Sequence, residues 1–310
     1  MPYAAPRPAA APLAAIGLTI AAMTLITLGD VFAKGTTTPV GVPAGVFGDG
    51  LGVGSGFAAF SRFLLGAVLL ALLMPAALRR EALGLAGDWR VWLRGALIAG
   101  CIWSVITAAA TEPLATVFGA FFVGPLVSAL LAVLFLGERM GRAQVACLGL
   151  GFLAVLLVVR PGWGPGFGVT TGTAFAVLAG LFYGGFLTTS RWLANRAQPL
   201  ALLLAQFAVG AVLLAPVGLA QLPAPGWSLA GLTLGSALAS LAGNLALILA
   251  YRRAPASQLA PLIYLQLIAG TGFGLAFFGD WPDAVTLAGL GLLIAAGVAG
   301  YLLAPRRAPA

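Results

Sequence analysis

Long apolar stretches, separated by short segments that hold charges, prolines and glycines, recur along the whole chain. Each is about 20 residues long, the length that an α-helix needs to cross a bilayer. Hydrocarbon offers the backbone no hydrogen-bond partner, so such stretches must be helical. The sequence therefore predicts an all-α membrane protein with ten transmembrane helices. They are expected at residues 13–32, 57–78, 92–111, 114–136 and 144–159, and then at 170–191, 199–219, 229–251, 257–278 and 284–304.

The composition supports a membrane protein and narrows its partners. Of the 310 residues, 61% are hydrophobic and 8% are charged, whereas soluble domains hold about 25% charged residues. The net charge of +8 comes from basic clusters between the apolar stretches, so lipid headgroups, and not a nucleic acid, are the expected partner. Since the chain has no histidine and only two, separated, cysteines, we expect no metal ion, no other cofactor and no enzymatic activity.

The basic residues predict how the chain is oriented. With the amino terminus in the cytoplasm, thirteen of the 16 Lys and Arg residues fall on the cytoplasmic side, as is usual for membrane proteins. Lys34 and Arg160 fall outside, and Arg62 lies within the second span. We therefore expect a multi-pass membrane protein with both termini in the cytoplasm. The run that begins at Leu13 is longer than a signal-peptide core and is expected to be retained. The oligomeric state stays open, a monomer included.

An internal repeat relates the two halves of the chain. The six residues from Gly66 recur unchanged from Gly210, and Leu136-Gly137-Glu138 corresponds to Phe278-Gly279-Asp280, 142 residues later. Five spans are an odd number, so the second copy must enter the bilayer upside down, an arrangement typical of transporters that work by alternating access. We expect two inverted five-helix repeats, residues 13–161 and 162–304, between cytoplasmic tails at 1–12 and 305–310.

The ends of the fourth and ninth spans resemble a known family. The resemblance rests in the first half on Pro125, Leu136-Gly137-Glu138, Gln144, Gly149, Gly151 and Pro161-Gly162, and in the second on Pro261, Gly279-Asp280, Pro282 and Gly291. This pattern looks like the repeat signature of the EamA-type drug/metabolite transporters. The resemblance covers nearly the whole chain and implies a ten-helix exporter of the bacterial inner membrane, similar to the aromatic amino-acid exporters. The sequence departs from the family in a long glycine-rich loop, 35–56, whose role is open, and in Asp280, which stands where the first half has Glu138.

Polar and aromatic side chains within the spans are candidates for the substrate cavity, because polar groups are costly in a bilayer. The candidates are Trp103, Thr107, Tyr183, Ser240, Asn244, Gln258, Tyr264 and Gln266. A spacing of four places Ser240 and Asn244 on one helix face, shared with Ser236 and Tyr251. The alternative for the serines is hydrogen bonding between helices, and the alternative for the aromatic residues is packing.

Three charged residues and two prolines have separate expected roles. Asp30 and Arg62 lie in the outer part of the bilayer and are expected to form a structural or gating ion pair, with Lys34 as a competing partner for Asp30. Pro125 and Pro261 are expected to kink their helices. Carbonyls freed near Pro261 are a candidate site for an ammonium group, and a simple packing kink is the alternative.

These expectations together favour a secondary transporter. We expect export of small metabolites, amino acids first among them, by alternating access. Transport of a quaternary amine, a sugar-nucleotide or a lipid-linked solute is the alternative, followed by an intramembrane enzyme. The glycine-rich segments 48–56 and 162–168 lack the Gly-Lys-Ser/Thr ending of a phosphate loop, so no ATP hydrolysis is expected.

Overall fold

The computed structural model describes residues 12–136, 141–160, 169–193, 196–254 and 259–303. Within these ranges the protein is helical and contains no β-strand. Nine helices there are long and apolar enough to cross a membrane, and a shorter apolar segment spans Leu262–Phe278. The long helices are α1 (Leu13–Thr37), α2 (Ser55–Leu73), α4 (Trp89–Ala109), α5 with α6 (Leu114–Phe121 and Val123–Leu136), α7 (Arg142–Val159), α8 (Thr171–Leu193), α9 (Pro199–Ala220), α10 (Trp227–Tyr251) and α13 (Ala284–Leu302).

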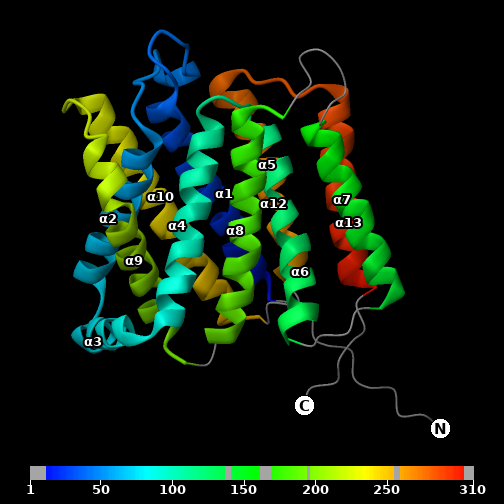
Figure 1. Ribbon diagram of the computed structural model, residues 1–310, viewed down its shortest axis with the longest axis horizontal. Helices are drawn as coiled ribbons and strands as arrows, with labels where there is room; N and C mark the ends of the chain where they lie inside the picture. The colour runs from blue at the N-terminus through cyan, green and yellow to red at the C-terminus, as the bar shows by residue number, and fades with distance from the viewer. Residues whose placement is uncertain (1–11, 137–140, 161–168, 194–195, 255–258, 304–310) are drawn as a thin grey trace.

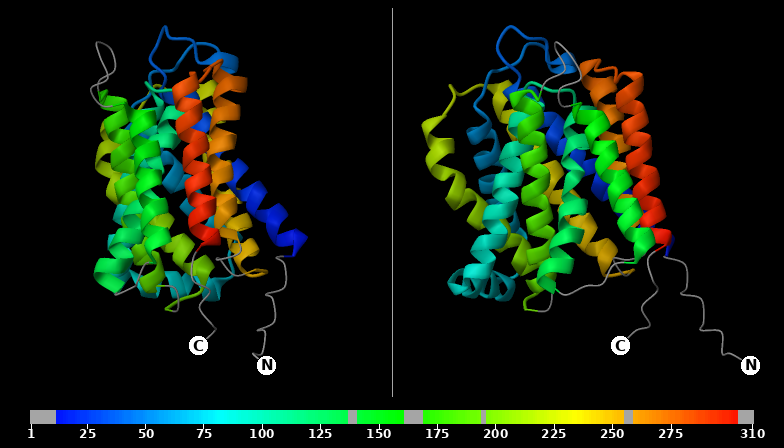
Figure 2. Two further views of the ribbon diagram at one scale, coloured as in Figure 1. Left: turned by 90° about the vertical axis from the view of Figure 1, so that its right-hand side faces the viewer. Right: turned by 45° about the vertical axis from the view of Figure 1, so that its right-hand side comes forward.

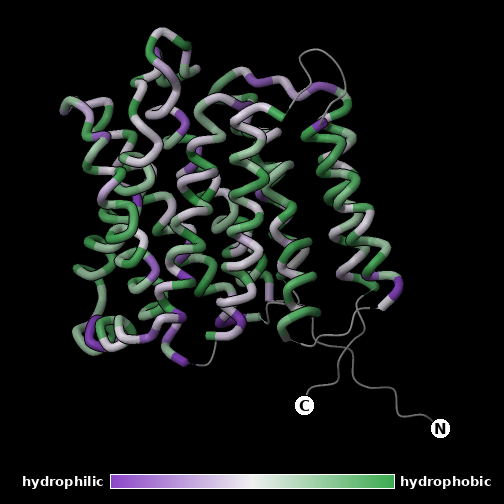
Figure 3. The backbone as a smooth tube through the Cα atoms, in the orientation of Figure 1, coloured by the Kyte–Doolittle hydropathy of each residue, from purple (hydrophilic) through white to green (hydrophobic). Residues whose placement is uncertain are grey.

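The helices stand side by side in one bundle (Figure 1). Figure 2 shows that α1 begins and α13 ends towards the same end of the bundle, opposite the loop that joins α1 to α2. Hydrophilic residues gather mostly at the two ends, while the middle of the bundle is mainly hydrophobic (Figure 3). The helices α1, α2, α4 and α7 of the first half pack against α10, α9, α8 and α13 of the second half, respectively. The halves are therefore joined along their whole width.

The second span is shorter than expected. Helix α2 ends at Leu73, and a separate short helix, α3 (Ala76–Gly84), lies across the end of the bundle. Pro75 explains the break, because a proline disfavours the helical conformation for the residue before it, and Met74 is extended. The expected range 57–78 was therefore too long by about one helical turn.

Two membrane segments are interrupted within their length. Helices α5 and α6 are separated at Phe122, and Pro125 lacks the N–H that would otherwise reach back to the carbonyl of Phe121. The segment Leu262–Phe278 is likewise composite: a 3₁₀ turn, η3 (Ala260–Tyr264), leads into α12 (Leu265–Phe273), and α12 continues as a π-helix, η4 (Gly274–Phe278). Such irregular backbone is tolerated at membrane depth only where protein or a water-filled cavity surrounds it.

Two glycines allow α2 and α9 to approach closely. A Cβ atom at Gly66 would lie 2.7 Å from the ring of Phe207, and a Cβ atom at Gly210 would lie 2.3 Å from the ring of Phe63. The two rings are in turn edge to face, with centroids 5.9 Å apart. Each helix thus supplies a ring and the glycine that makes room for the partner's ring.

The pair α7 and α13 repeats this reciprocal arrangement. A Cβ atom at Gly289 would lie 2.8 Å from the side chain of Val158, and one at Gly300 would lie 3.4 Å from the side chain of Cys147. Gly289 follows Cys147 by 142 residues, and Gly300 follows Val158 by the same interval. Small residues at such positions let neighbouring helices pack closely in a membrane.

The glycine-rich loop between α1 and α2 is packed onto the end of the bundle. Its 3₁₀ turn, η1 (Gly45–Phe47), places the ring of Phe47 within 6.0 Å of the ring centroids of Phe32, Phe277 and Phe278. Gly45 has a positive φ of 64°, and a Cβ atom there would lie 1.7 Å from the carbonyl oxygen of Phe277. The loop therefore has a defined seat on η4.

Candidate functional site

The two interrupted segments meet at their interruptions. The rings of Phe122, between α5 and α6, and of Tyr264, at the end of η3, have centroids 5.2 Å apart. Helices α5 and α12 also pack closely, since a Cβ atom at Gly270 would lie 2.2 Å from the ring of Phe118. Interrupted helices that meet in this way are the usual pointer to a binding site in transporters.

An aromatic row extends from this meeting point across the bundle to α8. It consists of five rings in successive contact: Tyr264, Phe122, Phe121, Tyr183 and Phe186. The closest pair is Phe121 and Tyr183, whose centroids are 4.8 Å apart. Two of the sequence candidates, Tyr183 and Tyr264, are thus connected through two phenylalanines that no sequence pattern distinguishes. From sequence alone, a phenylalanine that lines a binding site cannot be distinguished from one that only packs against its neighbours.

The other candidates from α4 and α12 occupy different surroundings. The indole N–H of Trp103 donates to the Ser55 hydroxyl at 3.2 Å, and Thr107 lies 2.9 Å from the same oxygen. These two side chains therefore contact the start of α2, and their place in the substrate cavity remains a prediction. Gln266 is buried in α12. Gln258 lies outside the described residues, and Pro261 lies within η3.

The polar face of α10 packs against α1. Ser236 donates to the carbonyl oxygen of Gly29 at 2.8 Å, and Asn244 donates to the carbonyl oxygen of Ser240 in its own helix at 2.8 Å. A Cβ atom at Gly29 would lie 2.7 Å from the Ser240 hydroxyl oxygen. That hydroxyl is buried and has no hydrogen-bond partner among the described residues, although buried polar groups are normally paired.

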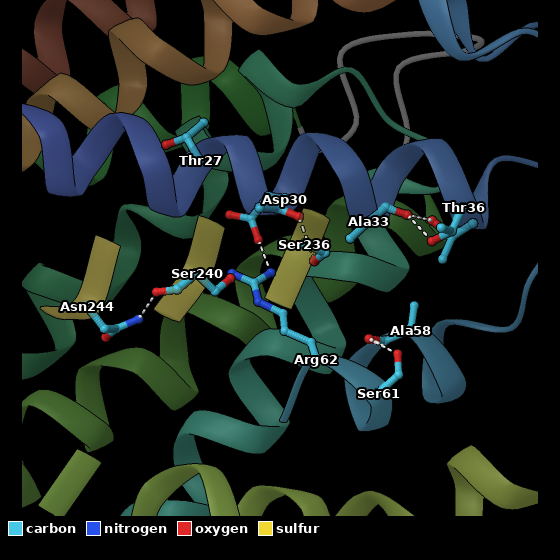
Figure 4. Close-up of polar contacts among 12 residues, drawn as sticks. Thr27, Asp30, Ala33, Thr36, Ala58, Ser61, Arg62, Ser236, Ser240 and Asn244 are labelled. Atoms are coloured by element: carbon cyan, nitrogen blue, oxygen red, sulfur yellow. Dashed lines mark hydrogen bonds and ion pairs between the residues drawn. The ribbon is translucent and has the colours of Figure 1, made fainter. Parts of the chain in front are cut away.

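A buried ion pair lies beside these serines. Nη1 of Arg62 in α2 donates to Oδ1 of Asp30 in α1 at 2.5 Å, and both side chains are 4% exposed. Figure 4 shows the pair where α1 and α2 meet the Ser236–Ser240 face of α10. Counting back from the ends of α1 and α2 at the α1–α2 loop, both residues lie about 10 Å deep. Charges buried in this way must be paired, because removing them from water is costly.

Lys34, the competing partner for Asp30, is engaged elsewhere. Its ammonium nitrogen lies 2.8 Å from Oδ2 of Asp280, donates to the carbonyl oxygen of Glu112 at 3.0 Å, and lies 4.6 Å from the centroid of the Phe278 ring. Lys34 therefore connects α1 to the α4–α5 turn and to the segment that follows η4. Sequence reasoning did not predict this pair, because its members are 246 residues apart.

A second charged cluster connects α7 to α13 at the same end. Arg160 contacts the carboxylate of Asp283 and lies 2.9 Å from the hydroxyl of Thr286. Asp283 also accepts from the backbone N–H of Thr286, which caps α13. The hydrogen bond from Arg160, together with that N–H, holds the pKa of Asp283 well below its usual range, and the same bond raises the pKa of Arg160. Among the described residues, no three His, Cys, Asp or Glu side chains are grouped so that they could hold a metal ion.

Comparison with known proteins shows a likeness to one transporter family. Residues 170–302 match the model of the EamA-like transporter family. A crystal structure of a protein that is 19% identical in sequence has the same fold, with a TM-score of 0.59 over 93% of this chain and 97% of that chain. The chain is thus similar to EamA-like transporters in its second half, and to the relatives below over most of its length.

Two relatives are transporters of different small molecules. The pseudopaline exporter CntI of Pseudomonas aeruginosa is 29% identical over 247 residues, which cover 77% of this chain and 84% of the exporter. The riboflavin transporter of Rhizobium johnstonii is 30% identical over 214 residues, which cover 67% of this chain and 64% of that transporter. The aromatic amino-acid exporters, which the sequence resembles, are a subgroup that these relatives do not single out.

Proposed function

We propose that the protein is a secondary transporter that exports small organic metabolites, amino acids first among them, by alternating access. The observation that carries the proposal is the contact of Phe122 with Tyr264, because it joins two interrupted membrane segments from opposite halves of the chain. In transporters, substrate sites lie where such segments meet near the middle of the bilayer. The aromatic row that starts there offers ring faces to an apolar or cationic part of a substrate.

Inverted repetition of the two halves is part of the proposal. The reciprocal contacts of Gly66 with Phe207 and of Gly210 with Phe63 support it, since a two-fold axis makes equivalent residues contact each other in both directions. Phe207 follows Phe63 by 144 residues, the offset of the identical hexapeptides. Ten spans follow if the segment Leu262–Phe278 crosses the membrane beside the nine longer ones.

The orientation is proposed on the same footing. The α3 end of the bundle carries Arg79 and Arg80, while Lys34 and Arg160 lie at the opposite end. Cytoplasmic loops are the ones that collect basic residues, so we assign the α3 end to the cytoplasm. Export would then run from the α3 end towards the α1–α2 loop. Labelling of single cysteines added next to Arg79 and at Gly48 in whole cells tests this assignment.

A flavin-like solute is the second candidate. One relative is a riboflavin transporter, and a row of five rings suits a planar heteroaromatic molecule as well as an aromatic amino acid. Purified protein in liposomes preloaded with L-phenylalanine, L-leucine, choline or riboflavin separates the candidates. We expect efflux of an amino acid to be faster than from protein-free vesicles loaded with the same solute. Efflux of riboflavin alone would replace the first candidate with the second, and no efflux of any of the four solutes would refute the proposal.

A further inference from the structure

Arg94 is a basic side chain within a long helix that contacts only neutral groups of two neighbouring helices and one aromatic ring. It lies in the second turn of α4, where its Nε donates to the Ser190 hydroxyl of α8 at 3.0 Å and its Nη1 donates to the carbonyl oxygen of Leu202 of α9 at 3.3 Å. Its guanidinium carbon lies 4.7 Å from the centroid of the Phe186 ring. All of these partners are neutral, so the charge of this half-buried guanidinium is not compensated by them.

The comparison with two other cations makes this difference informative. Lys34 and Arg62 are also buried in the bundle, and each lies against an aspartate, Asp280 and Asp30 respectively. Within the described part of the chain, Arg94 has no carboxylate within 4.0 Å. A cation inside a membrane protein normally pairs with an anion or marks the path of a charged substrate.

The acidic residues nearest to Arg94 in the chain are engaged with other groups. Asp88 caps α4 by accepting from the backbone N–H of Arg90 and lies 3.8 Å from Arg196. Glu81 accepts from the backbone N–H of Gln198 at 2.8 Å. An anion for Arg94 is thus best supplied from outside the protein.

The position of Arg94 connects this anion to the proposed transport site. Phe186, on which its guanidinium lies, is the last ring of the aromatic row that reaches Phe122 and Tyr264. The polar groups that hold Arg94 belong to α8 and α9, so the side chain reaches into the seam between the halves. A carboxylate can accept two parallel N–H···O bonds from a guanidinium and neutralises its charge, whereas Ser190 and Leu202 each accept one bond and carry no charge, so a carboxylate would displace them from Arg94.

We propose that Arg94 binds the carboxylate of the transported metabolite at the α3 end of the bundle, with the apolar part of the metabolite on the aromatic row. This inference rests on the proposed function and specifies its substrate class: small carboxylates with an aromatic or apolar side group. It makes Arg94 the residue that selects a carboxylate over the corresponding uncharged carboxamide.

The test compares L-phenylalanine with L-phenylalaninamide, which keeps the ring and the amino group but lacks the carboxylate. Efflux of each is measured from liposomes that hold the wild type, Arg94→Gln, Arg94→Lys or, as a matched control, Arg90→Gln. Arg90 lies one turn earlier in α4 and likewise has no carboxylate within 4.0 Å among the described residues. Its guanidinium lies against Trp89 and Trp192, which are not part of the aromatic row. Thermal unfolding of each purified variant identifies any loss of flux that comes from a loss of folding.

We expect Arg94→Gln to lower phenylalanine efflux about tenfold, the effect of losing one hydrogen bond between charged groups, and to leave phenylalaninamide efflux nearly unchanged. Arg94→Lys should retain part of the preference, and Arg90→Gln should resemble the wild type. An equal fall in the efflux of both probes would overturn the inference and would mean that Arg94 only holds α4 against α8 and α9. A fall that follows the content of anionic lipid would overturn it in favour of a headgroup site. Wild-type vesicles that move neither probe would refute amino-acid export itself, and the inference with it.

Discussion

Phe122 and Tyr264 lie ring against ring, 5.2 Å apart, although 142 residues separate them in the chain. This interval is the same as that between Leu136-Gly137-Glu138 and Phe278-Gly279-Asp280, which follow the two residues. Each ring also lies at a break in its own membrane segment. In the proposed inverted repeat, the two breaks would stand at equivalent places beside the two-fold axis.

Replacing either ring with leucine should lower both the stability of the protein and its transport rate. Phe122→Leu and Tyr264→Leu each remove one member of the pair, whose mutual contact is worth about 0.5–1.5 kcal/mol beyond the buried area. A double-mutant cycle measured by thermal unfolding should recover a coupling of that size. Tyr264→Phe, which keeps the ring, should retain most of the flux. Phe152→Leu, at an exposed position on α7, serves as the control, and a coupling near zero would contradict the prediction.

Breaking the buried pair of Asp30 and Arg62 should be strongly destabilising. Asp30→Asn or Arg62→Gln leaves one buried charge without its partner, which costs about 3–5 kcal/mol in comparable cases. The double variant Asp30→Asn/Arg62→Gln removes both charges and should cost less than the sum of the two single changes. Thermal unfolding measures all three variants. If the double variant is stable but does not transport, the pair acts in gating and not only in folding.

The seam of α2 and α9 should tolerate no added methyl group. A Cβ atom at Gly66 or Gly210 would lie under 3 Å from a phenylalanine ring of the partner helix, and overpacking of this kind costs about 1–3 kcal/mol. We expect Gly66→Ala and Gly210→Ala to lower the melting temperature. Gly149→Ala is the matched control, because a Cβ atom there meets nothing within 4 Å. Equal melting temperatures for all three variants would mean that the seam is not tightly packed.

The glycine-rich loop should detach from the bundle when a side chain at Gly45 prevents its contact with η4. Gly45 and Gly48 both have a positive φ, but only at Gly45 would a Cβ atom collide with the backbone of η4. Gly45→Ala should therefore speed hydrogen exchange of the amides from Val42 to Val53 far more than Gly48→Ala does. Similar exchange rates in the two variants would show that positive φ alone, and not the contact with Phe277, fixes the loop.

The bond between Arg160 and Asp283 predicts a dependence of stability on acid pH. Because the pKa of Asp283 is lowered in the folded protein, its contribution is complete above the usual carboxyl value of about 3.9 and is lost as the pH falls further. The melting temperature of the wild type should therefore fall more steeply below about pH 4 than that of Asp283→Asn. Asparagine keeps a capping oxygen for α13, so the comparison isolates the charge. Parallel curves between pH 3 and pH 7 would contradict the assignment.

The positions of the spans were predictable, because their length and their flanking charges are set by the bilayer. Nine of the ten expected spans correspond to long apolar helices among the described residues. The remaining one, expected at 257–278, corresponds to the shorter segment Leu262–Phe278. The end of α2 was misplaced, because an apolar run continues to Leu78 while Pro75 already ends the helix. Hydropathy alone does not show where a proline ends a helix, so the apolar run was assigned to one helix beyond Pro75.

The contacts within the candidate site were less predictable. Tyr183 and Tyr264 carry polar groups that are unusual in a span, so they were selected, whereas Phe121 and Phe122, which connect them, resemble any other apolar residue. Arg94 was one of the thirteen basic residues assigned to the cytoplasmic side, and its contacts with α8 and α9 were not expected. The partners in these contacts are distant in the chain, and no local pattern encodes such pairings.

The pairing of Lys34 with Asp280 has a consequence for biosynthesis. A ribosome makes Lys34 early, and 246 further residues must be added before Asp280 exists. Asp30, one turn earlier in α1, waits only 32 residues for Arg62. The charge of Asp30 can therefore be neutralised much earlier in synthesis than the charge of Lys34.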